Sequence, residues 1–170
     1  FAETAGDSPA GTLTFNPYRR VGEQESRGVG EQGSRGVGEQ LGQLHPDLNI
    51  TFTEEGFISA RTTSTGNGGN INIFAPENIN ISGEGRITVE TTGAGNAGII
   101  NIETENLKIA ENTTISASTS DMGDGGSINI TPSQTFQLEG QILTETTGTG
   151  DGGNITINTG EMIAPNSTIS

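Results

Sequence analysis

One phrase decides the fold of this chain, and its first copy reads Gly66-Asn67-Gly68-Gly69-Asn70-Ile71-Asn72-Ile73. Three further copies occupy residues 95–102, 123–130 and 150–157, and each ends in two isoleucines separated by Asn or Thr. The copies begin at 66, 95, 123 and 150, so they are 29, 28 and 27 residues apart. Self-similarity at a fixed period in this range indicates a repeat architecture.

Two further sets of apolar pairs keep the same period. Within each pair a polar residue separates two apolar ones, which is typical of a short strand with one buried face. The first set is Leu48/Ile50, Ile79/Ile81, Leu107/Ile109 and Phe136/Leu138, with Met162 or Ile163 beginning a fifth. The second is Ile58/Ala60, Ile87/Val89, Ile115/Ala117 and Ile142/Thr144, with Ile169 opening the next.

Three short strands per repeat predict an all-β solenoid, a parallel β-helix of ~28-residue coils stacked ~4.8 Å apart. The Thr- and Gly-rich segment of each repeat is expected to bend at one edge, where Gly and Asn tolerate positive φ. The alternative is a β-sandwich of hairpins, which gives no reason for repeated sequence every ~28 residues. We therefore favour the solenoid.

Residues 19–46 interrupt this pattern with an eight-residue low-complexity repeat that begins at Val21, Val29 and Val37. The segment has no apolar periodicity and is predicted to be disordered. If it is removed, Leu13 and Phe15 match the first strand of a repeat, and Leu48 resumes as the second. The predicted organisation is a partial coil at 1–18, the insert at 19–46 and β-helix repeats at 47–170, about four and a half coils cut open at both ends.

Composition excludes several classes of function. The chain has 21 Asp+Glu against 7 Lys+Arg, a formal net charge of −14, which disfavours nucleic acid as a partner. It has no Cys and a single His, His45, so thiolate and multi-His metal sites are excluded. Only 29% of the residues are hydrophobic, and the phased strands use nearly all of them in a narrow stacked core.

Stacking places equivalent positions of successive coils side by side, so candidate sites are ladders. Asn67, Asn96, Asp124 and Asp151 form one ladder, in which Asp124 and Asp151 are weak Ca²⁺ candidates. The alternative is that these side chains cap their own turn, which we favour. Asn72, Asn101 and Asn129 form a second ladder, predicted to be structural. A third, on the outward face of the third strand, is Arg61, Glu90, Ser118 and Glu145.

At Thr65–Ile73 and Ile115–Thr119 the sequence resembles the repeat region of filamentous-haemagglutinin-like two-partner-secretion exoproteins, in the style of the cyanobacterial ones. The resemblance covers about residues 48–170 and the interrupted coil before them. It implies a right-handed β-helix that is secreted or held at the outer membrane. It also implies export by an outer-membrane partner transporter and contact with a host surface, a neighbouring cell or a glycan.

Two functions are compared on this basis. The first is a non-enzymatic, adhesive segment of an exoprotein without a cofactor, supported by the regular repeat and the absence of a catalytic constellation. The second is a polysaccharide-binding or polysaccharide-active β-helix protein, similar in architecture to pectate lyases or to glycosidases with paired carboxylates. Such an enzyme needs aromatic platforms and, for acidic glycans, cations, whereas the regular coils contain only Arg61, Arg86 and Lys108 as basic residues. The sequence favours the adhesive segment.

Overall fold

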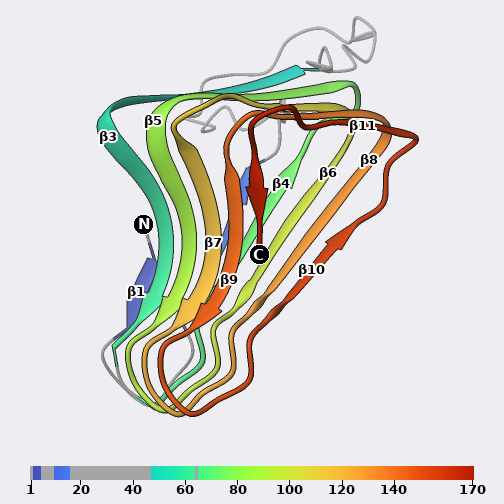
Figure 1. Ribbon diagram of the computed structural model, residues 1–170. Coiled ribbons are helices and arrows are strands. Elements are labelled where there is room, and N and C mark those ends of the chain that lie inside the picture. Colours follow the sequence, from blue (N-terminus) through green and yellow to red (C-terminus); the bar gives the residue numbers. More distant parts are fainter. Residues whose placement is uncertain (1, 5–9, 16–46, 64) are drawn as a thin grey trace, which may run out of the picture.

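The computed structural model describes residues 2–4, 10–15, 47–63 and 65–170 of the chain (Figure 1). These residues contain no helix, and their strands pair only in parallel. The fold is therefore a β-solenoid with about 28 residues per turn, and the β-sandwich of hairpins is excluded. Among these residues, none belongs to a helix with the length and apolar character needed to span a membrane. The predicted insert at 19–46, with His45, lies outside the described residues.

The strands follow one another around the solenoid axis. They are β1 (Ala2–Thr4), β2 (Thr12–Phe15), β3 (Asp47–Thr62), β4 (Asn70–Phe74), β5 (Asn78–Thr91), β6 (Ile99–Ile109), β7 (Thr113–Thr119), β8 (Ser127–Leu138), β9 (Gln141–Thr146), β10 (Asn154–Ile157), β11 (Glu161–Ile163) and β12 (Thr168–Ile169). We number the coils by these strands: coil 1 is β2 and β3, coil 2 is β4 and β5, coil 3 is β6 and β7, coil 4 is β8 and β9, and coil 5 is β10 to β12.

The pairing divides each coil among three faces. The first face holds β2, β4, the beginnings of β6 and β8, and β10. The second holds the beginnings of β3 and β5, the ends of β6 and β8, and β11. The third holds β1, the ends of β3 and β5, and then β7, β9 and β12. In Figure 1 the strands β3, β5, β7 and β9 follow one another from the left toward the middle.

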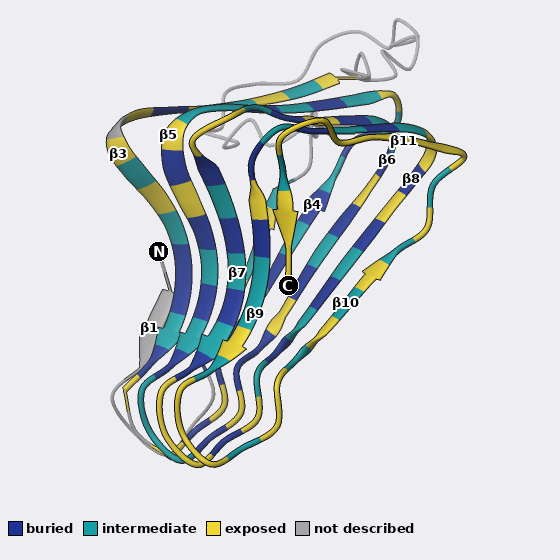
Figure 2. Cartoon of the chain, in the orientation of Figure 1, coloured by how far each residue is buried: buried dark blue, intermediate teal, exposed yellow. Residues whose placement is uncertain are grey.

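The core consists of ladders of like residues. Ile71, Ile100 and Ile128 stack on the first face, and Ile87, Ile115 and Ile142 on the third; all six are fully buried. Burial alternates from residue to residue along β4 and β7, as the two-residue period requires, and Figure 2 shows this banding on the strands of coils 2 and 3. The predicted apolar pairs of coils 2 to 4 are thus confirmed as the core, apart from the half-buried Thr144. Those at the two ends are less buried: Leu48, Ile50 and Ile58 pack half-buried against the core, and Met162, Ile163 and Ile169 are exposed. Met162, rather than Ile163, continues the ladder through Phe136.

The interrupted coil is confirmed by register. Leu13 pairs with Ile71 on the first face, and Leu48 pairs with Ile79 on the second. β2 and β3 are therefore consecutive strands of coil 1, although 31 residues separate Phe15 from Asp47 in the sequence. The structure adds one strand that the sequence reading missed, because Ala2–Thr4 pairs with Ala60–Thr62 as the third strand of a preceding coil.

Two expectations of local structure were wrong. Each repeat was predicted to hold three separate strands, but the second and third are continuous in β3 and β5, and the first and second in β6 and β8. Register shifts between Phe52 and Gly56 and between Thr104 and Asn106 turn the corner inside a continuous strand in β3 and β6.

The glycines of the repeated phrase were expected to provide positive φ, and this was also wrong. Gly83 is the only described glycine in the left-handed region, and it lies outside the phrase. The reason for the phrase glycines is close approach between coils. A Cβ on Gly98 would lie 1.8 Å from the Gly69 carbonyl oxygen, and one on Gly126 would lie 2.1 Å from the Gly98 oxygen. Any side chain would therefore force the coils apart at this corner.

We expect Gly126→Ala to destabilise the chain by about 1–3 kcal/mol, because the added methyl group overlaps the Gly98 carbonyl and also lies 3.0 Å from the Ala117 Cβ. Gly152→Ala is the matched control, since a Cβ there has nothing within 4 Å. Urea unfolding followed by far-UV circular dichroism measures both variants. Equal midpoints for the two would show that close approach does not determine the glycine at this corner.

Candidate functional site

The ladder of Asn67, Asn96, Asp124 and Asp151 lies at the glycine corner between the third and first faces. The side chains of the first three residues each accept a hydrogen bond from the backbone of the next coil. The backbone N–H of Asn96 donates to Asn67 Oδ1 at 3.0 Å, that of Asp124 to Asn96 Oδ1 at 2.9 Å, and that of Asp151 to Asp124 Oδ1 at 2.9 Å. The predicted stacking of these four residues is confirmed.

Buried threonines secure the same corner from inside. The hydroxyl of Thr62 donates to the Asn67 carbonyl at 2.8 Å, and that of Thr91 donates to the Asn96 carbonyl at 3.0 Å. Thr146 repeats the bond to Asp151 at 2.8 Å, whereas the buried Thr119 hydroxyl has no partner. The corner between the third and first faces is thus held both by its own Asn and Asp side chains and by the threonine hydroxyls at the ends of the preceding strands.

This arrangement gives the two carboxylates a structural role. Asp124 is exposed and is already an acceptor for the coil above it. The part of the chain that the structure describes holds no group of three or more His, Cys, Asp or Glu residues that could bind a metal ion. Ca²⁺ needs six to eight oxygen ligands, so the geometry fits a bend-capping ladder better than a cation centre.

An Asn side chain can replace Asp124 as a hydrogen-bond acceptor for the Asp151 N–H, but it cannot supply the negative charge of a Ca²⁺ ligand. Asn keeps the Oδ1 acceptor, so we expect Asp124→Asn to unfold at the wild-type urea midpoint, while Asp124→Ala loses about 1 kcal/mol. The same curves are measured with and without millimolar CaCl₂. A Ca²⁺-dependent rise in the midpoint that is present in the wild type and lost in Asp124→Asn would instead assign a metal-binding role.

The predicted Asn ladder is confirmed as a chain of side-chain hydrogen bonds on the outside of the first face. Asn101 Nδ2 donates to Asn72 Oδ1 at 2.8 Å, and Asn129 Nδ2 donates to Asn101 Oδ1 at 2.9 Å. All three side chains are half-buried. The ladder therefore links coils 2, 3 and 4 without contributing to the apolar core.

Two comparable ladders on the second face were missed by the sequence reading. Asn78 Nδ2 donates to Asp47 Oδ1 at 2.7 Å, and Asn106 Nδ2 donates to Asn78 Oδ1 at 3.2 Å. Beside them, Asn80 Nδ2 donates to Asn49 Oδ1 at 3.0 Å. The signal was present, because these residues precede or separate the apolar pairs that the repeat analysis had already aligned.

Asn101→Ala should destabilise the chain by about 1–2 kcal/mol, because one truncation removes two ladder bonds and leaves half-buried amide groups of Asn72 and Asn129 unpaired. Asn154→Ala on coil 5 provides the control, since Asn154 is exposed and outside the ladder. The midpoints of thermal unfolding decide between them. A loss as large in Asn154→Ala would mean that the ladder bonds contribute nothing of their own.

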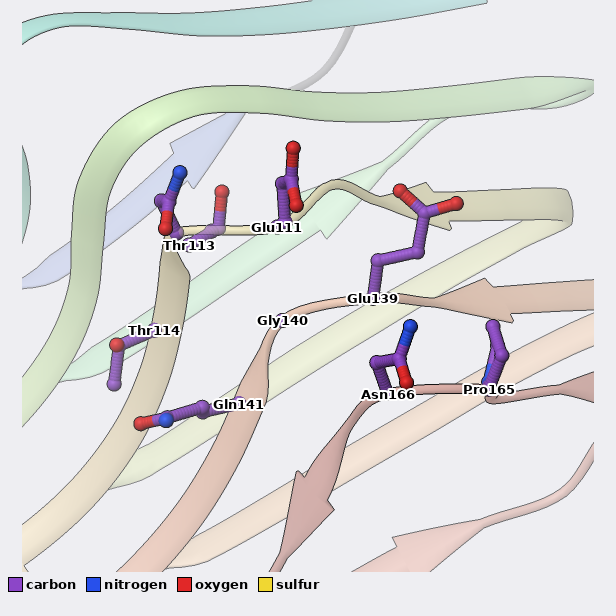
Figure 3. A pocket seen from close by; sticks show the side chains of 9 residues that line it. Glu111, Thr113, Thr114, Glu139, Gly140, Gln141, Pro165 and Asn166 are labelled. Atoms are coloured by element: carbon purple, nitrogen blue, oxygen red, sulfur yellow. The ribbon is translucent and has the colours of Figure 1, made fainter.

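A polar hollow of about 390 Å³ lies at the corner between the second and third faces (Figure 3). It forms because coil 4 crosses this corner with only Glu139 and Gly140, whereas coil 3 uses residues 110–113. Figure 3 shows the Glu111 and Glu139 side chains on neighbouring coils, with Pro165 and Asn166 on the next one. Glu111 is exposed, and Glu139 accepts a hydrogen bond from Gln137 Nε2 at 2.8 Å.

The Arg61, Glu90, Ser118 and Glu145 ladder is confirmed on the outward side of the third face. Arg61 Nε lies 3.7 Å from Glu90 Oε2, and the two side chains are 39% and 37% exposed. This distance is too long for a hydrogen bond, and an exposed pair contributes about 0–1 kcal/mol. The ion pair therefore contributes little to holding coils 1 and 2 together.

Comparison with protein-family models, with curated proteins and with solved structures found no match for this chain.

Proposed function

We propose that this chain is a structural, adhesive segment of a filamentous exoprotein that mediates contact with a surface or with another cell. The observation that supports it most directly is the solenoid itself. Coils repeat in register, so the fold extends along one axis, and its outer surface carries polar ladders and Thr/Asn/Gly-rich corners. In a repeat protein each coil contacts only its neighbours, so further coils can be added along the axis. A long solenoid of this kind can therefore present a binding surface far from the point at which the protein is anchored.

The cellular setting is part of the same proposal. The resemblance of the repeats to two-partner-secretion exoproteins supports a secreted or outer-membrane-associated location. It also supports an outer-membrane partner transporter for the full-length protein. A host surface, a neighbouring cell or a glycan is the proposed target. The surplus of 14 negative charges supports a target other than nucleic acid.

A polysaccharide-active protein is the second candidate, and the hollow in Figure 3 is the observation that favours it. Two carboxylates on neighbouring coils are the groups with which glycosidases protonate a leaving oxygen and activate water or the sugar. The hollow does not enclose these two side chains, since Glu111 is exposed and Glu139 only half-buried, whereas small-molecule sites bury most of the ligand's surface. We therefore propose a non-enzymatic role for the chain.

The adhesive function is tested with producing cells that lack the parent protein. These cells should adhere and aggregate less than the wild type. Adhesion should return with a version lacking residues 123–149, because removal of one whole repeat joins Met122 to Gly150 in register. A version lacking residues 123–136 is the control and should fail, since it removes only part of a coil and joins the strands out of register.

Normal adhesion of cells without the parent protein would contradict the proposal. Turnover of a polyuronide or of a neutral polysaccharide by the purified chain, lost in Glu139→Gln, would favour the second candidate instead.

A further inference from the structure

A groove of about 620 Å³ lies on the outward side of the third face, over coils 1 to 3. This volume is within the roughly 300–1,000 Å³ of small-molecule sites. Its wall includes Phe57 and Arg61 from β3, Arg86 and Glu90 from β5, and Asn112 from the corner before β7. The groove is therefore assembled from different coils and exists only in the stacked fold.

The groove departs from the repeat in residue type. Phe57 and Arg86 share a stacking position that Thr114 and Gln141 occupy in coils 3 and 4. Arg61 shares its position with Glu90, with which it forms an exposed ion pair, and with Ser118 and Glu145. In coil 3 the small, uncharged Thr114 and Ser118 occupy these two positions, so in-register stacking does not by itself require an aromatic ring or a guanidinium group there.

The groove also brings together two kinds of side chain that are rare on the surface of the described residues, an exposed aromatic ring and basic groups. Phe57 is 61% exposed, and no other aromatic of the described residues is comparably exposed. Arg61 and Arg86 are two of the three cations among the described residues, the third being Lys108 on the second face. Arg61 Nε is shielded from solvent, has no hydrogen-bond acceptor and lies 3.7 Å from Glu90 Oε2, while the Arg61 side chain as a whole is 39% exposed. The exposed part of the guanidinium group, and not Nε, is therefore the part that can meet a ligand oxygen.

The backbone provides an independent observation. Among the described residues, Glu55 with φ of 58° and Asn112 with φ of 64° are the only non-glycine residues in the left-handed region, and both line this groove. Asn adopts this conformation readily, but Glu does so at a cost. Strained backbone that the surrounding structure maintains is concentrated at binding sites.

We propose that this groove binds a neutral saccharide. An aromatic ring provides an apolar platform for the C–H face of a sugar, and its polar surroundings fix the orientation. Sugar hydroxyls both donate and accept hydrogen bonds, which matches a wall in which Arg61 and Arg86 only donate while Glu55, Glu84 and Glu90 only accept. Three carboxylates against two guanidinium groups leave the wall with one negative charge, which disfavours an anionic glycan. This assignment rests on the adhesive function, because it names the ligand class that the surface contacts.

The test uses the whole chain and a panel of neutral linear oligosaccharides of two to six hexose units, titrated by calorimetry and by NMR of the arginine Nε–Hε signals. Uronic-acid and sulfated oligosaccharides of the same lengths are run in parallel. We expect saturable binding of a neutral oligosaccharide that shifts the Arg61 and Arg86 signals. Phe57→Thr should weaken this binding at least tenfold, as should the pair Arg61→Ser and Arg86→Thr.

These substitutions introduce residue types already present at the same ranks of coil 3, so the fold is expected to persist, and far-UV circular dichroism verifies it. Lys108→Gln is the matched control. It removes a cation outside the groove and introduces the residue type found at the same rank of coil 4, and binding should be unchanged. Absence of binding to every neutral oligosaccharide, equal binding by the folded groove variants, or stronger binding of the anionic sugars would each overturn the assignment.

The same variants separate this inference from the proposed function in the cell-adhesion assay. Adhesion that depends on the parent protein but persists in the groove variants would overturn the groove as the contact site while the scaffold function stands. Normal adhesion without the parent protein would overturn the scaffold function, and the titrations would then decide the groove alone.

Discussion

The rest of this structure depends on one constraint, the in-register stacking of parallel strands on successive coils. At a strand spacing of ~4.8 Å, each residue lies against its counterpart in the coils before and after it. Each side chain must therefore tolerate, and preferably bind, the side chain at the same position of the neighbouring coils. Isoleucine does so by close packing, Asn by passing an amide hydrogen bond along the stack, and glycine by adding nothing where backbones meet.

The same constraint explains how a chain with 29% hydrophobic residues forms a continuous core. Every second strand residue points inward, and the inner positions of coils 2 to 4 are almost entirely Ile, Leu, Val, Ala and Phe136. The remaining residues lie at the corners or point outward from the strands. The phase of the apolar residues along the chain, and not their number, therefore determines which of them are buried.

Most of this was accessible from the sequence because stacking makes structure periodic. The period, the core pairs, the ladders through Asp124 and Asn101, and the interruption of coil 1 all follow from aligning the chain with itself. The short match of Ala2–Thr4 was missed, although Glu90 and Thr91 repeat its last two residue types. The role of the glycines in the repeated phrase could not be predicted. Close approach between coils and a positive φ both favour glycine, and only the three-dimensional structure distinguishes the two reasons. The groove was not predicted, because its residues are defined by departure from the repeat.

The corners show why hollows form where they do. The corner between the third and first faces has seven residues in every coil, at 63–69, 92–98, 120–126 and 147–153. The ladder of Asn67, Asn96, Asp124 and Asp151 and the closely approaching glycines hold successive coils in register there, so an inserted residue would disrupt the coils on both sides.

The corner between the second and third faces has no such repeated ladder and varies in length, from residues 51–56 in coil 1 to 139–140 in coil 4. Coils whose corners differ in length cannot stack evenly. The hollow beside Glu139 lies at this corner, and the groove beside Phe57 extends from this corner onto the third face. In this solenoid, the corner of constant length between the third and first faces preserves the register of the coils. The corner between the second and third faces tolerates changes in length, and it is there that a binding surface can form.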